Sequence, residues 1–124
     1  MKVKQIIRYY FLSAEAERRI ERLILKKACK AFDARSAEDC VAEVVALTIK
    51  RQRLRELNSL LSWAMNTFTP QDRMVLYRYA FSRITEDEGK RAHRLAEAFA
   101  RRIRSHSQEH AEGIAAMKEF CFFD

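Results

Sequence analysis

The sequence predicts an all-α protein, and three observations lead to this prediction. The 124-residue chain contains only two glycines and one proline, whereas sheet proteins need many turn residues. Hydrophobic residues make up 48% and charged residues 33%, as in an ordinary folded domain. Apolar residues recur mostly at steps of three and four, which is the spacing of one helix face. We expect a long antiparallel helical hairpin followed by a compact cluster of helices.

A first helix is expected from about Val3 to Phe32. Its apolar positions keep helical spacing near both ends, but residues 13–19 are only weakly apolar. The helix therefore either continues there, with only a small apolar contact to its neighbours, or it bends. Ser36, with an acidic residue three positions later, forms a pattern like a capping box, so a second helix is expected to begin at Ala37.

The second helix is expected from Ala37 to Thr67, with a heptad-like apolar seam. The residues at seven-residue steps are Cys40, Leu47, Leu54, Leu61 and Phe68. Two long helices joined by a few residues must lie antiparallel to hide such stripes. The seam also allows a homodimer or another protein partner, with Leu54, Leu61 and Phe68 as the contact residues.

Three shorter helices are expected after the hairpin. Thr69 and Pro70 form a strong start signal for a helix over 70–81, which is apolar on almost every side and must be covered by neighbours or by a partner. Residues 85–88 form a second capping box with an acidic first turn, and that helix should end near Arg104. A fifth helix and a Phe-rich tail complete the chain. We divide it into a hairpin over 1–68 and a helical cluster over 69–124, within one compact domain overall.

The charge of the chain favours an anionic partner, with nucleic acid first. The formal net charge is +7, and arginine outnumbers lysine by 16 to 8. Arginine makes bidentate contacts with phosphate and with guanine. On the fourth helix, the face opposite the apolar stripe carries Lys90, Arg94, Arg101 and Arg104, with Glu97 among them.

Enzymatic chemistry finds little support in the sequence. The two glycines stand apart, which excludes a Gly-rich phosphate loop. His106 and His110 have the spacing of two metal ligands on a helix, but a third ligand is missing. The consecutive carboxylates at 86–88 are explained by capping. We therefore expect no catalytic residue, no metal and no cofactor.

Localisation is expected to be cytoplasmic. The three cysteines, Cys29, Cys40 and Cys121, are an odd number without a repeating spacing, which is typical of free thiols in a reducing compartment. No signal peptide is visible, and no run of about 20 apolar residues is present, so no membrane partner is expected.

The segment Thr69-Pro70-Gln71-Asp72-Arg73-Met74-Val75-Leu76-Tyr77-Arg78-Tyr79 resembles the entry to the helix-turn-helix of sigma-factor region four. With the long hairpin ahead of it, the chain also looks like the small phage transcription regulators of the RinA and ArpU type. The resemblance covers roughly residues 40–104. It implies a helix-turn-helix-like fold, a role in transcription with RNA polymerase as a partner, and binding of promoter-region double-stranded DNA. By position, the resemblance makes Lys90, Arg91, Arg94 and Arg101 the residues that face DNA.

A second hypothesis is a helical module that binds another protein. Its surface would consist of the apolar helix over 70–81, with Met74 and Tyr77, and of Phe122 in the tail. The two hypotheses differ in one observation, which is whether the protein has measurable affinity for duplex DNA at low salt.

Overall fold

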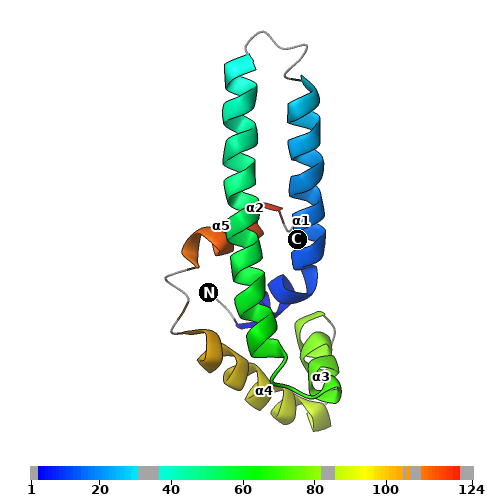
Figure 1. Ribbon diagram of the computed structural model, residues 1–124. Coiled ribbons are helices and arrows are strands. Elements are labelled where there is room, and N and C mark those ends of the chain that lie inside the picture. Colours follow the sequence, from blue (N-terminus) through cyan, green and yellow to red (C-terminus); the bar gives the residue numbers. More distant parts are fainter. Residues whose placement is uncertain (1–2, 31–36, 82–85, 105, 107–109, 121–124) are drawn as a thin grey trace. The chain divides into compact units, whose positions relative to one another are not determined.

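The computed structural model describes residues 3–30, 37–81, 86–104, 106 and 110–120, and this part of the chain is 94% helical. It contains five helices and no strand: α1 (Val3–Lys30), α2 (Ala37–Met65), α3 (Pro70–Phe81), α4 (Glu86–Arg104) and α5 (Ala111–Phe120) (Figure 1). The all-α fold class is therefore confirmed. The expected caps at Ser36 and Thr85 and the tail residue Phe122 lie outside the described residues.

The chain divides into two compact units, and each unit uses distant parts of the sequence. Unit 1 comprises residues 1–12 and 58–109, and unit 2 comprises residues 13–57 and 110–124. The helices α1 and α2 each contribute to both units. The division expected from the sequence, between residues 68 and 69, stays a prediction.

Unit 2 contains an antiparallel pair formed by the second part of α1 and the first part of α2. Lys27 pairs with Glu43 at 2.9 Å, and Glu17 pairs with Arg55, so residue numbers run in opposite directions along the two helices (Figure 1). The expected hairpin is confirmed here. The helix α1 is unbroken through residues 13–19, and Ser13 and Ala16 are buried small residues there.

The expected fifth helix is present, and it packs on this pair. Gly113 is buried, and a Cβ atom at this position would lie 2.6 Å from the backbone oxygen of Arg53. Glycine therefore permits the close approach of α5 to α2. Met117 and Phe120 are buried on the same helix, and Arg19 donates a hydrogen bond of 2.9 Å to the carbonyl oxygen of Phe120.

Unit 1 is built from the first turns of α1, the end of α2, and α3 with α4. The expected cap of α3 is present, because the backbone N–H of Asp72 donates to the hydroxyl of Thr69 at 3.2 Å. The helices α3 and α4 pack against each other (Figure 1). Arg8 of α1 donates to the carbonyl oxygen of Ala80 in α3 at 2.6 Å. Among the fully buried residues are Ile7, Leu61, Met65, Leu76, Ala92 and Phe99.

The heptad seam of α2 is part of the core in its second half. Leu54 and Leu61 are buried, together with Leu57 and Ala64. Phe68 is buried as well, but it lies beyond the end of α2, which comes at Met65 and not at the expected Thr67. In the first half, Cys40 and Leu47 are only partly buried.

Candidate nucleic-acid interface

Positive charge is concentrated in one of the two units. Unit 1 contains twelve Lys and Arg residues against six Asp and Glu residues, a formal charge of +6. Unit 2 contains twelve against eleven, a formal charge of +1. Because a polyanion is attracted by net charge over its contact area, a nucleic-acid interface is favoured on unit 1.

The basic side chains of unit 2 are largely paired within the unit. The ion pairs, with N···O distances of 3.7 Å or less, are Lys27 with Glu43, Lys50 with Glu119, Arg53 with Glu56 and Glu112, Arg55 with Glu17 and Glu21, and Arg18, Arg19 and Arg22 with Glu15. These pairs also affect titration. The hydrogen bond from Arg18, together with the charges of Arg19 and Arg22, lowers the pKa of Glu15. Most of the basic residues of unit 2 are therefore partners of carboxylates in the same unit.

Two ion pairs connect α3 and α4 in unit 1. Arg78 of α3 binds the carboxylate of Glu88 at 3.0 Å, and Arg91 of α4 binds the carboxylate of Asp72. The Arg78 pair neutralises Glu88 in the acidic first turn of α4. Arg91, which the resemblance placed against DNA, lies in an ion pair that joins the two helices, and we do not include it in the interface.

The remaining cations of α4 form one exposed face. Lys90, Arg94 and Arg101 are exposed and share a helix side, because their spacings of four and seven residues are close to whole turns. Among the residues that the structure describes, none of these three cations has a carboxylate within 4.0 Å. Arg104 is exposed on the same side. We call Lys90, Arg94 and Arg101 the α4 cationic face.

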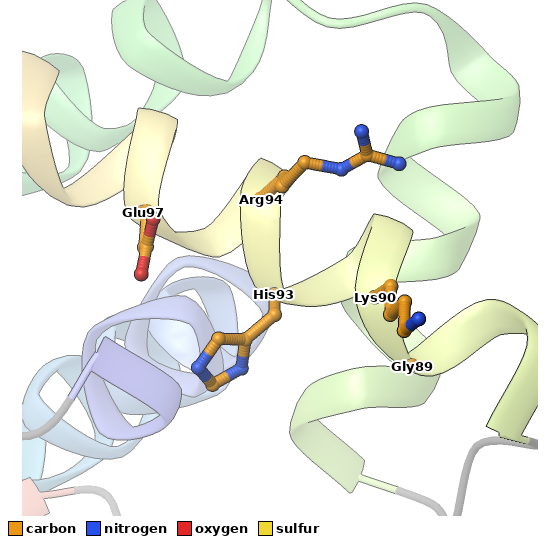
Figure 2. A pocket seen from close by; sticks show the side chains of 5 residues that line it. All are labelled: Gly89, Lys90, His93, Arg94 and Glu97. Atoms are coloured by element: carbon orange, nitrogen blue, oxygen red, sulfur yellow. The ribbon is translucent and has the colours of Figure 1, made fainter.

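A shallow hollow lies along the first half of this face. It is lined by Gly89, Lys90, His93, Arg94 and Glu97 (Figure 2). In this view, the cationic ends of Lys90 and Arg94 lie to one side of His93, and the carboxylate of Glu97 lies to the other. His93 contacts the ring of Tyr79, with 6.1 Å between the ring centroids. Glu97 adds one negative charge to the side of α4 that carries the α4 cationic face.

The fourth helix is continuous from Glu86 to Arg104. Residues 89–90, which include the glycine of this helix, are helical like their neighbours. Residues 86–104 thus hold no helix-turn-helix of their own. A helix-turn-helix-like pair in this region would have to consist of α3 and α4.

The residues expected to bind a protein partner have different environments. Leu54, Leu61 and Phe68 are buried in the core of the chain itself. Met74 and Tyr77 on α3 are 54% and 42% exposed. Sequence reasoning missed that Phe11 of α1 packs edge-on against Tyr77, with ring centroids 5.1 Å apart. It also missed that the guanidinium of Arg102 lies over the ring of Phe68 at 4.3 Å, so this cation faces the core rather than the α4 cationic face.

In the described part of the chain, no three His, Cys, Asp or Glu side chains come together as metal ligands. His106 contacts the ring of Trp63. None of the helices described combines the length and the apolar character needed to cross a bilayer. Cys29 is an exposed free thiol, and Cys40 is a partly buried one.

Comparisons of this chain with protein-family models, with curated proteins and with solved structures gave no match.

Proposed function

We propose that this protein is a non-enzymatic DNA-binding protein that contacts the phosphates of double-stranded DNA through the α4 cationic face. The supporting observation is the contrast between the two units. The basic residues of unit 2 are mostly neutralised by carboxylates, whereas Lys90, Arg94 and Arg101 are exposed and have no carboxylate partner among the described residues. Cations without an internal partner can exchange their counterions for phosphates.

The dimensions of the face suit a phosphate backbone. Lys90 and Arg101 are separated by about 16 Å along the helix, at about 1.5 Å per residue. One DNA strand carries a phosphate about every 3.4 Å along the duplex axis. The face can therefore follow one edge of a groove over several phosphates.

Phosphate contact is favoured over the reading of bases. A recognition helix reads bases with its N-terminal residues, and α4 begins with the acidic residues Glu86, Asp87 and Glu88. Glu97 adds a further negative charge in the middle of the face. We therefore propose binding with weak sequence selectivity. The resemblance to sigma-like and phage regulators supports transcription as the process served.

The salt dependence of binding tests the proposal. Lys90→Ala, Arg94→Ala and Arg101→Ala, combined in one variant, remove three phosphate contacts. The slope of log affinity against log salt should then become shallower by about 2.7, at about 0.9 per contact. Between 50 and 200 mM salt, the affinity of the parent should fall about 40-fold more than the affinity of the variant. Fluorescence anisotropy with a labelled duplex measures both values.

A matched control separates local contact from net charge. Lys26→Ala, Arg51→Ala and Lys118→Ala remove three positive charges from unit 2, and none of these residues has a described ion pair. The slope of this variant should stay within about 0.5 of the parent value, because screening limits charges that do not touch DNA. Equal slopes for the two triple variants would contradict the proposal, as would a parent without duplex affinity at low salt.

A second candidate function is supported by the exposed apolar face of α3. Met74, Tyr77 and Phe81 are large apolar residues with at least a third of their surface exposed, and they form one side of this helix. We propose RNA polymerase as the partner to test, because the resemblance implies it. Met74→Glu combined with Tyr77→Glu should abolish binding to purified polymerase, while the α4 triple variant should retain it.

A further inference from the structure

A further cation of unit 1 lies near the hollow on α4, but it comes from α1. The ammonium of Lys4 lies over the ring of Tyr79, with 4.9 Å between the nitrogen and the ring centroid. The same ring contacts His93 edge-on, with 6.1 Å between the centroids. His93 lines the hollow together with Lys90 and Arg94 (Figure 2). Contacts among three helices of unit 1 thus connect Lys4 to the α4 cationic face.

The positive charge of Lys4 is not neutralised within the described chain. Lys4 is exposed, and no carboxylate of the described residues lies within 4.0 Å of its ammonium. An aromatic ring attracts a cation without cancelling its charge, and an ammonium on a ring keeps N–H groups that point away from it. Arg8, one turn further along α1, differs because it donates a hydrogen bond to the carbonyl oxygen of Ala80. Lys4 can therefore bind an outside anion while it stays on Tyr79.

The ring of Tyr79 gives the Lys4 side chain a defined position. A lysine has a flexible four-carbon stem, and fixing it when a ligand binds costs conformational entropy. Tyr79 is partly buried and is in contact with His93 of α4, so the fold already holds its ring. A lysine that rests on such a ring before DNA arrives loses less freedom on binding.

Lys4 lies to one side of the line that the α4 cations form. Lys90, Arg94 and Arg101 follow one line along a single helix. Consecutive helix residues are about 100° apart, so His93 lies beside that line, and its contact with Tyr79 leads on to Lys4. Contacts along one line leave a bound duplex free to roll about it. A phosphate contact away from the line fixes the orientation of the duplex, which is what phosphate contacts do in protein–DNA complexes.

We propose that Lys4 of α1 binds a phosphate of the same DNA duplex that the α4 cationic face contacts, and that Tyr79 is the residue that positions Lys4. This inference rests on the proposed function. It extends the interface from one helix to a surface made by α1, α3 and α4.

The salt dependence of duplex binding tests the contact of Lys4. Lys4→Ala should make the slope of log affinity against log salt shallower by about 0.9, because one phosphate contact is lost. Between 50 and 200 mM salt, the affinity of the parent should then fall about 3.5-fold more than the affinity of the variant. Lys4→Arg keeps a cation that can lie over the ring, so it should retain the parent slope.

Lys26→Ala is the matched control for Lys4→Ala. Lys26 is also an exposed lysine of α1 without a described ion pair, but it belongs to unit 2. The two variants have the same net charge. The slope of Lys26→Ala should equal the parent slope, because screening limits charges that do not touch DNA.

Variants of Tyr79 test the positioning role. Tyr79→Phe keeps the ring and should retain the parent slope. Tyr79→Leu removes the ring, and its slope should become shallower by up to the 0.9 expected for Lys4→Ala. Lys4→Ala combined with Tyr79→Leu should have the slope of Lys4→Ala, because both substitutions remove the same contact. Circular dichroism establishes that each variant keeps its helices.

The outcomes distinguish this inference from the proposed function. If the α4 triple variant has a shallower slope than the parent but Lys4→Ala does not, the inference is overturned and the proposed function stands. Equal slopes for Lys4→Ala and Lys26→Ala also overturn it. Additive effects of Lys4→Ala and Tyr79→Leu overturn the positioning role of Tyr79. A parent without duplex affinity at low salt overturns the inference and the proposed function together.

Discussion

Gly113 lies where α5 meets α2, and replacing it by alanine tests how tightly the two helices pack. An added Cβ would lie 2.6 Å from the backbone oxygen of Arg53 and 2.8 Å from the Cβ of Leu57. Neither atom belongs to the flexible end of a side chain. The main chain of α5 or α2 must therefore move by several tenths of an ångström, and the buried contacts of Met117 and Phe120 move with it.

The expected loss of stability follows from two opposing effects. Overpacking of a close contact costs about 1–3 kcal/mol, and the upper value applies because the obstructing atom is a backbone oxygen. Alanine gains up to about 1 kcal/mol over glycine through its helix propensity. The net loss is about 2 kcal/mol. For a chain of this length it corresponds to a decrease in Tm of about 8 °C.

Gly89 provides the control for this prediction. It lies in α4, and a Cβ there would meet nothing within 4 Å. Gly89→Ala should therefore stabilise the protein by about 0.5–1 kcal/mol, a rise in Tm of about 2–4 °C. Thermal unfolding followed by circular dichroism measures both variants. The reasoning is refuted if Gly113→Ala is as stable as the parent, or if the two substitutions shift Tm in the same direction.

Three further predictions concern single polar groups. Glu97→Gln should raise the affinity for duplex DNA about twofold at low salt, with the gain disappearing at high salt, because it removes a negative charge from the α4 cationic face; unchanged anisotropy titrations would place DNA elsewhere. Thr69→Ala should cost about 1 kcal/mol in chemical unfolding because α3 loses its cap, and Thr69→Ser should retain that stability. Hydrogen bonding from Arg18 lowers the pKa of Glu15 in the folded state. The ionised Glu15 carboxylate should therefore stabilise the protein at neutral pH, and this stabilisation should be lost as the pH falls through the lowered pKa. A carboxyl NMR titration that places Glu15 at or above the ordinary glutamate pKa would contradict this expectation.

The helices could be predicted from sequence because their signals are local. The Thr69-Pro70 start fixed the first residue of α3, and the end of α4 at Arg104 followed from its apolar stripe. Exposure of three large apolar residues on α2 was not predicted, because the seven-residue seam was taken to explain the apolar residues of that helix. Val41, Val45 and Ile49 repeat at four residues and lie on another side.

Which cations lack a carboxylate partner also could not be predicted from sequence. Lys50 is separated by 69 residues from its partner Glu119, and Arg53 by 59 residues from its partner Glu112 in α5. Ion pairs between distant segments depend on tertiary packing, and the spacing of residues along the sequence does not show which segments meet. The α4 cationic face could be anticipated because Lys90, Arg94 and Arg101 oppose the apolar stripe of a single helix.

The interleaved course of the chain through its two units affects how the protein folds. Arg8 contacts Ala80 across 72 residues, and Arg19 contacts Phe120 across 101 residues. Helical proteins usually fold quickly because their contacts are local, but here long loops must close first. We therefore expect slower folding than for a simple bundle of the same size. During translation, α1 and α2 can form early, but the buried contacts of unit 2 cannot be completed until α5 has been synthesised.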